Sequence, residues 1–372
     1  MKNRLNLVRL IAVWLVAGVV AQTNSGRPIS AHSCRLLLLG RRGWKMVAAK
    51  AGTVVSKVSF GGVLLSYGTS GNRFASVTGI YPHGVRFDIH DIGSGRRRAG
   101  FNLSGLAPPP PMMGALEGVV FFGRHSAYFQ AWKFVDHGKT LSSSTNWLAK
   151  VNLKTGAASQ NVLIPLPYGA AMLFQAIAVP KGMVLFCPRC GVPTSARWYT
   201  PATAKLVRLP RVVPKRGGLI FVKNYGLLAW GPHGKLQRIT HANMSLGDFP
   251  SLSIPRGVVN IHVALHGSTP RLACLSWLNM AGQPTDQPSR SALFMYDLKQ
   301  HKILWRKVFK FPMSVLNTSF RVSANGRVFA FLNWQGKPQV VFYDHPRDRI
   351  TTVKLPVSGV SLRYNSRVIA VK

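Results

Sequence analysis

Short strand–turn–strand segments recur along this chain at a nearly constant spacing. In the clearest copy, residues 291–305, the turn starts at Asp297. Residues 147–156 have the same form, with Asn152 at the turn. Weaker copies have turns that start at residues 91, 200 and 344. Asp and Asn suit these positions because their side chains accept hydrogen bonds from the backbone N–H groups that follow.

The spacing of the turns predicts the architecture. Successive turn starts are 61, 48, 97 and 47 residues apart. A period of 47–48 residues is typical of β-propellers, in which each repeat forms a four-stranded blade. The interval of 97 is then two repeats, with a weaker hairpin at residues 227–239 inside it. The interval of 61 is one repeat with an insertion that includes Pro108–Pro111.

We therefore expect an all-β fold, a β-propeller of about seven four-stranded blades, with six to eight as the bounds. The last full unit predicts strands at 319–323, 327–333, 339–343 and 350–355. Strands at 361–364 and 367–371 then lack partners, and N-terminal strands within about Met46–Ser66 are expected to complete their blade. Closing the ring in this way removes exposed sheet edges. We assign residues 22–45 to an N-terminal linker and residues 46–372 to a single propeller domain.

The N-terminus has the pattern of a secretory signal peptide. Lys2, Arg4 and Arg9 precede an uncharged apolar run that extends from Leu10 to Ala21. About 12 residues are too few to span a bilayer, which needs roughly 20. We expect residues 1–21 to be removed after Ala21, with an uncleaved anchor as the alternative. The mature chain is then periplasmic or secreted, with no transmembrane span.

The charge balance is strongly one-sided: 48 Lys and Arg stand against 9 Asp and Glu, and Glu117 is the only glutamate. Charged residues are only 15% of the chain, against about 25% in an average protein. The imbalance therefore reflects a shortage of Asp and Glu more than an excess of Lys and Arg. Because carboxylates lose their stabilising ion pairs when they are protonated, a fold with few of them suits an acidic extracytoplasmic space, such as that of an acidophile.

A basic chain also attracts anions, so an anionic envelope surface is a second, compatible explanation of the charge. Export and the even spread of Lys and Arg along the sequence argue against nucleic acid as the partner. The longest basic run is Arg96, Arg97 and Arg98, and these three residues are our candidates for a basic surface.

The segment at residues 293–305, an apolar strand, an Asp turn and a Leu-Trp strand, resembles the PQQ-like repeat of quinoproteins. More loosely, it is similar to WD40 and YVTN blades. The resemblance implies a propeller. It also implies, as an alternative function, an extracytoplasmic oxidoreductase that binds PQQ with calcium, uses an Asp base and often has a disulfide of adjacent cysteines. This chain has no adjacent cysteine pair.

The chain has four cysteines, Cys34, Cys187, Cys190 and Cys274. An even number suits an oxidising compartment, so all four are disulfide candidates. Cys187 and Cys190 form a C-x-x-C pair and are weak candidates for a metal site, but no second such pair supplies the other ligands of a closed zinc site. Redox exchange is the remaining alternative for this pair. His262 and His266 lie in a predicted strand, where a core or surface role is the simpler interpretation.

No residue pattern identifies a catalytic centre, and the seven tryptophans that recur across the repeats are explained by packing. The hypothesis from the sequence is a non-catalytic binding or scaffold propeller of the cell envelope, monomeric and without a cofactor. Its partner would be an envelope protein or an anionic envelope surface. A basic or apolar exposed face would favour this hypothesis, whereas a polar funnel holding an ion would favour the oxidoreductase.

Overall fold

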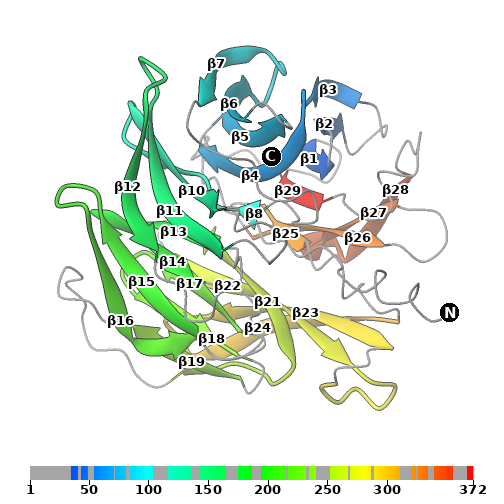
Figure 1. Ribbon diagram of the computed structural model, residues 1–372. Helices are drawn as coiled ribbons and strands as arrows, with labels where there is room; N and C mark the ends of the chain where they lie inside the picture. Colours follow the sequence, from blue (N-terminus) through cyan, green and yellow to red (C-terminus); the bar gives the residue numbers. More distant parts are fainter. Residues whose placement is uncertain are drawn as a thin grey trace, which may run out of the picture.

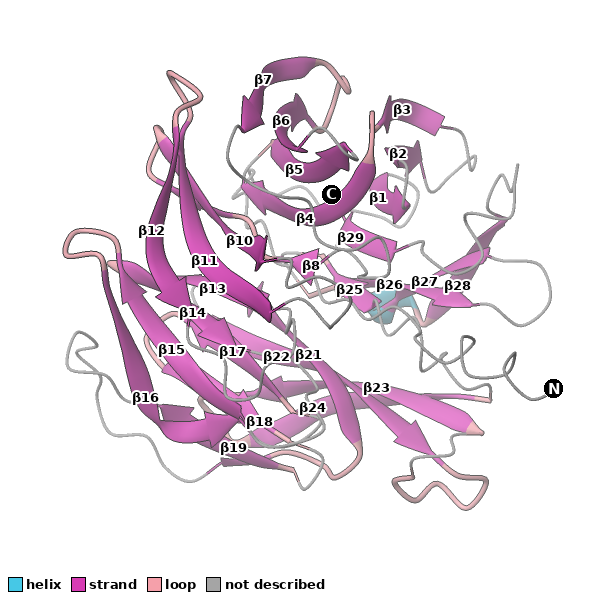
Figure 2. Ribbon diagram, viewed as in Figure 1, coloured by secondary structure: helices cyan, strands magenta, loops and turns pink. Residues whose placement is uncertain are grey.

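The computed structural model is a ring of seven β-sheets arranged around one axis (Figure 1). Strands make up nearly all of the regular structure (Figure 2), and the chain has a single short 3-10 helix among the residues described, η3 (His345–Arg347). The structure describes residues 35–40, 43–48, 54–70, 72–80, 84–103, 116–135, 143–164, 175–186, 194–213, 217–231, 234–239, 252–266, 269–285, 289–310, 320–323, 326–333, 339–354 and 367–371. The predicted all-β propeller of about seven blades is confirmed.

We number the blades along the chain and give the strands of each from the axis outward. Blade 1 contains β29 (Arg367–Val371), β1 (Arg35–Gly40), β2 (Gly43–Ala48) and β3 (Val54–Ser59). Blade 2 contains β4 (Val63–Ser70), β5 (Arg73–Ile80), β6 (Gly84–Asp91) and β7 (Arg97–Leu103), with β8 (Leu116–Glu117) added on the inner side of β4. Blade 3 contains β9 (Val120–Phe122), β10 (Ser126–Val135), β11 (Ser143–Asn152) and β12 (Ala158–Ile164).

The remaining blades follow the same order. Blade 4 contains β13 (Gln175–Val179), β14 (Gly182–Phe186), β15 (Thr194–Thr200) and β16 (Lys205–Val213). Blade 5 contains β17 (Gly218–Val222), β18 (Gly226–Trp230), β19 (Lys235–Ile239) and β20 (Leu252–Ser253). Blade 6 contains β21 (Val258–His266), β22 (Thr269–Leu278), β23 (Arg290–Asp297) and β24 (Lys302–Phe309). Blade 7 contains β25 (Phe320–Val322), β26 (Val328–Asn333), β27 (Gln339–Asp344) and β28 (Arg349–Lys354).

The two ends of the chain close the ring together, as predicted. The C-terminal strand β29 pairs antiparallel with β1, and it also lies beside β25 of blade 7. The boundary between linker and domain was wrong: β1 begins at Arg35, inside the segment expected to be a linker. The predicted strands at 361–364 lie outside the described residues. One C-terminal strand therefore needs three N-terminal strands to make a four-stranded blade, so the domain starts earlier than Met46.

The repeats found in the sequence are the hairpins that join the third and fourth strands of blades 2, 3, 4, 6 and 7. Blade 5 is the exception, because its third strand ends at Ile239 and its fourth begins only at Leu252. The hairpin at residues 227–239 joins its second and third strands instead, which explains its position off the midpoint. The long interval after Asp91 contains the extra strand β8, which runs parallel to β4. Pro108–Pro111 lie outside the described residues.

Aromatic and aliphatic side chains fill the spaces between neighbouring blades. Phe87 of blade 2 packs against Phe129 of blade 3, with ring centroids 6.0 Å apart. Trp198 is fully buried between blades 4 and 5, and Trp305 of blade 6 contacts Phe329 of blade 7. The interpretation of the recurring tryptophans as packing residues is confirmed for these two positions.

The junction of blades 2 and 3 offers a test of this packing. A Cβ added to Gly68 on β4 would collide with the backbone oxygen of Val119, whereas a Cβ added to the exposed Gly61 would meet nothing within 4 Å. We expect Gly68→Ala to lower the free energy of unfolding by about 1–3 kcal/mol, the usual cost of overpacking. Gly61→Ala is the matched control and should change it little. Equal unfolding midpoints in urea for the two variants would contradict the packing of this junction.

Candidate functional site

All five aspartates that the structure describes form ion pairs. The pairs join Asp88 to Arg86 and Arg97, Asp91 to Arg98, Asp297 to Arg271, Asp344 to Arg347, and Asp348 to Lys307, at 2.6–3.4 Å. They lie in blades 2, 6 and 7. Each of these carboxylates therefore has a structural role in its own blade or at the contact with the next blade.

Three of the predicted turn residues also hold their turns through hydrogen bonds. The Asp91 carboxylate accepts from the backbone N–H of Ser94 at 2.8 Å. Asp297 accepts from the backbone N–H groups two and three residues further along the chain, at 2.8 and 2.9 Å, and Asn152 does the same at 2.9 and 3.3 Å. Asp344 differs, because its side chain caps no N–H group and pairs with Arg347. The prediction of Asp and Asn as turn caps is thus confirmed at three positions and wrong at Asp344.

The predicted basic run lies at the outer edge of blade 2, and all three side chains are exposed. Arg97 and Arg98 on β7 pair with Asp88 and Asp91 at 2.7 and 2.6 Å. Two of the three positive charges are therefore already balanced by carboxylates, and Arg96 alone of the run has no carboxylate among the described contacts.

The described cysteine does not form a disulfide. Cys274 lies on β22, is completely buried in the core between blades 5 and 6, and its thiol is free. Burial raises the pKa of this thiol well above its ordinary value. Including Cys274 among the disulfide candidates was therefore wrong, because it packs as a small apolar side chain beside Leu272 and Phe294. Cys34, Cys187 and Cys190 lie outside the described residues.

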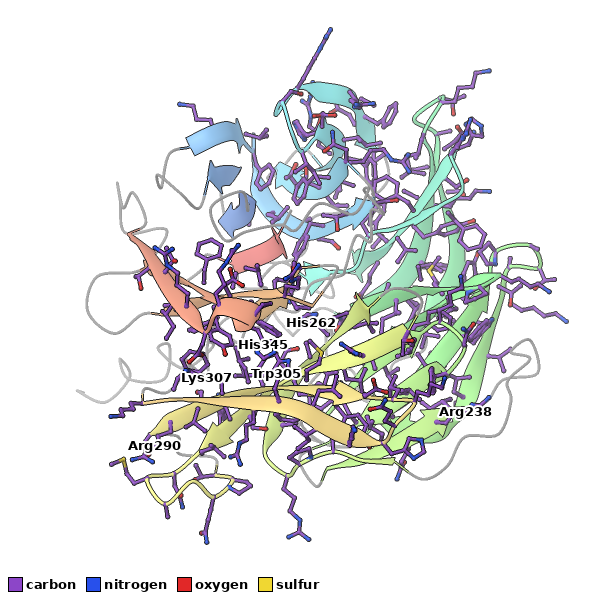
Figure 3. The ribbon with its side chains drawn as sticks, turned by 180° about the vertical axis from the view of Figure 1, so that it is seen from behind. Arg238, His262, Arg290, Trp305, Lys307 and His345 are labelled. Carbon is purple, nitrogen blue, oxygen red and sulfur yellow. The ribbon has the colours of Figure 1, made fainter. Side chains whose placement is uncertain are left out.

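Buried polar side chains lie on four of the innermost strands. Those less than a tenth exposed are Ser66 on β4, Gln175 on β13, Asn260 and His262 on β21, and Arg321 on β25. His262 lies near the centre of the ring (Figure 3). Its Nε2 is 2.6 Å from the guanidinium of Arg321. Because arginine can only donate, His262 accepts this hydrogen bond and is neutral.

Neither the axis nor any other described region gathers the side chains of a metal site: no group of three His, Cys, Asp or Glu residues occurs among the residues described. A second polar group joins the outer strands of blades 6 and 7 (Figure 3). There the ring of Trp305 stacks on His345 at 3.9 Å, and Lys307 bonds to Asp348 at 2.7 Å. Burial lowers the pKa of His345. These contacts fix one blade against the next.

The most unusual surface is a sector without acid. From residue 137 to residue 247 the sequence has fourteen Lys and Arg residues and no Asp or Glu. Because each of these blades is a continuous stretch of chain, this span forms one sector of the ring, from β11 of blade 3 through blade 4 to β19 of blade 5. We call it the basic sector. Its exposed cations include Lys154, Lys181, Lys205, Arg208 and Lys223.

Sequence reasoning missed the basic sector because the positive charges are evenly spread along the chain. The signal was the gap between Asp136 and Asp248, where acid is absent. That gap gains a spatial meaning only when consecutive repeats are known to be neighbours in a ring.

Comparison with known proteins supports the fold and no family. No known family model and no curated protein matches the sequence. Among solved structures, a candidate 6-phosphogluconolactonase from Bacteroides uniformis is similar with a TM-score of 0.52 and 13% identity, over 91% of this chain and 99% of that one. A second, from Bacteroides fragilis, has a TM-score of 0.51 and 11% identity, over 93% and 99%.

TolB from Acinetobacter baumannii is also similar, with a TM-score of 0.40 and 12% identity over 90% of this chain. This chain spans 65% of the length of TolB. At such identities the similarity concerns the fold alone. The chain is a seven-bladed β-propeller, the fold that its resemblance to PQQ-like and WD40-like blades implied.

The ion pairs predict a defined response to acid. The Ser94 N–H and Arg98 lower the pKa of Asp91 to about 2, from an ordinary 3.8. A lowered folded pKa stabilises the fold above pH 3.8, and this contribution is lost as the pH falls towards 2. Asp91→Asn should therefore lower the free energy of unfolding at pH 7 by about 0.2–1 kcal/mol, as for an ion pair whose arginine is exposed, and by a smaller amount at pH 2, where Asp91 is partly protonated.

Urea denaturation at pH 7, 4 and 2 measures this difference. The matched control is Asn152→Asp, which adds a carboxylate at the equivalent turn of blade 3 and should gain stability relative to the parent as the pH rises. A deficit of Asp91→Asn that is equal at pH 2 and pH 7 would contradict the ion pair as its cause.

Proposed function

We propose that this protein is an exported, non-catalytic binding propeller of the cell envelope, and that its basic sector holds a polyanionic partner. The observation that carries the proposal is the distribution of charge. The described carboxylates are engaged in ion pairs in blades 2, 6 and 7, whereas the span that forms the basic sector contains no carboxylate. A surface with charges of one sign attracts partners of the opposite sign and accelerates their association.

The proposal includes an acidic extracytoplasmic location. Few carboxylates means that little ion-pair stabilisation is lost in acid, and Lys and Arg keep their charge there. The basic sector therefore keeps its charge at low pH. A partner must likewise remain anionic, which favours phosphate diesters and sulfate esters over carboxylates. The apolar run at residues 10–21 supports export, and the described residues include no helix long and apolar enough to cross a membrane.

The alternative, a quinoprotein oxidoreductase, needs carboxylate and amide oxygens at a calcium site. Some polar residues on the innermost strands carry amide oxygens, which calcium can bind. His262 and Arg321, however, place a neutral imidazole and a cation there, and neither is a calcium ligand. We therefore propose that the protein works as a monomer and without a redox cofactor.

Binding to anionic vesicles tests the proposed function. We expect the purified protein to sediment with phosphatidylglycerol vesicles and not with phosphatidylcholine vesicles at both pH 3 and pH 7. The bound fraction should fall several-fold between 50 and 500 mM salt, because the attraction is screened. Equal sedimentation with the two vesicle types, or none with either, would contradict the proposal.

The quinoprotein alternative is tested with the same preparation. Addition of PQQ and Ca²⁺ should leave the thermal unfolding temperature unchanged under the binding-propeller proposal, since only a ligand of the folded state raises it. A rise that requires both components would favour the oxidoreductase.

A further inference from the structure

Two arginines lie directly opposite each other within the basic sector. Arg197 on β15 and Arg208 on β16 are cross-strand partners in the outer half of blade 4. Directly opposed residues have Cβ atoms about 4.5–5.5 Å apart, and like charges in this arrangement destabilise a sheet. The attractive counterpart is found in blade 6, where Arg271 on the second strand and Asp297 on the third are cross-strand partners.

Strand alternation shows which side of blade 4 the pair occupies. Ala196 and Trp198 pack into the core between blades 4 and 5. Arg197 therefore lies on the other face with Tyr199, whose ring is 5.6 Å from that of Tyr128 in blade 3. The arginine pair thus lies on the face of blade 4 that meets blade 3.

Blade 3 supplies a third cation on the facing side. Leu148 of β11 packs in the core shared with blade 4, so Lys150, two residues further on, lies on the same face of its blade. Lys150 is two residues before the turn at Asn152, and Arg197 is three residues before the equivalent turn at Thr200. Each of the two side chains therefore lies shortly before the turn that joins the third and fourth strands of its blade.

The three cations differ in exposure. Arg197 and Lys150 are half-buried, while Arg208 is exposed and open to a ligand. Burial, and then the charge of Arg208, lower the pKa of Arg197. Both causes act against the charged form, and an anion placed between the two guanidinium groups would relieve the second.

We propose that Arg197 and Arg208, with Lys150, form a binding site for a phosphate group carried by the polyanionic partner. This proposal rests on the proposed function, which supplies the polyanionic partner, and it adds that the partner presents phosphate groups. Each guanidinium offers two parallel N–H donors, a geometry that matches phosphate oxygens, and lysine adds a point charge. A phosphate group can bridge the two opposed arginines and replace their repulsion by two attractions.

Fluorescence anisotropy with a labelled polyphosphate chain tests the site. The test variant is the double replacement Arg197→Ala and Arg208→Ala, and the matched control is Arg124→Ala with Arg256→Ala, which removes two exposed arginines outside the basic sector. We expect the test variant to bind about tenfold or more weakly, and the control to change by less than about threefold, since hydrogen bonds to charged groups contribute more than distant charges. Arg208→Ala alone, at an exposed position, repeats the test if the double variant does not fold.

Inorganic phosphate gives a second measurement that does not depend on the polymer. Phosphate at about 50 mM should raise the unfolding temperature of the parent protein more than chloride at equal ionic strength does. This gain should disappear in Arg208→Ala. In the phosphate-free buffer, Arg208→Ala should unfold at a slightly higher temperature than the parent, because the repulsion is gone.

The outcomes separate the site from the function. If the parent binds polyphosphate and the test and control variants weaken binding equally, the site is overturned while the proposed function stands. If the parent binds neither polyphosphate nor anionic vesicles, the proposed function fails. The phosphate-dependent gain in unfolding temperature then decides alone, and its absence overturns the site as well.

Discussion

The pairing of β1 with β29 is the interaction on which the whole ring depends. It joins residues 36–39 to residues 367–371, near opposite ends of the sequence, whereas the strands of blades 2 to 7 pair within continuous stretches of chain. Without it, blade 1 loses its innermost strand and blade 7 loses its neighbour. The ring would then have two exposed edges, which propellers avoid by this kind of closure. The early start of the domain at Arg35 follows from the same need for three N-terminal strands.

The scarcity of acid has a less simple effect on stability than the sequence suggests. The fold has few carboxylates, but all five described aspartates form ion pairs, so protonating them lowers the free energy of unfolding. Burial also lowers the pKa values of His90 and His345, and buried neutral histidines lose stabilisation as the pH falls below about 6.5. His262 accepts a hydrogen bond that it can accept only when neutral. Histidines as well as aspartates therefore set how acidic the surroundings can become.

The fold could be predicted from the sequence to the extent that each blade repeats a local signal. A turn closed by Asp or Asn between two apolar strands depends on neighbouring residues alone, which is why Asp91, Asn152 and Asp297 revealed their blades. Blade 5 lacks such a turn and was located from the double interval and the weaker hairpin at residues 227–239. Closure of the ring by the two ends of the chain was predicted, but the choice of β1 as the partner of β29 and the free, buried state of Cys274 depend on contacts distant in the sequence.

The candidate site shows the same division in another form. In a propeller, position along the chain becomes position around the ring, so a stretch without acid becomes a sector without acid. By that rule, the absence of Asp and Glu between Asp136 and Asp248 indicates a basic surface, but it does not indicate that one arginine lies opposite another. The pairing of Arg197 with Arg208 depends on the register of β15 and β16, which includes a shift between Ser195 and Arg197. If the register of Thr194↔Val213 and Ser195↔Val212 continued without this shift, Arg208 would lie opposite Tyr199, so the proposed phosphate site depends on this irregularity.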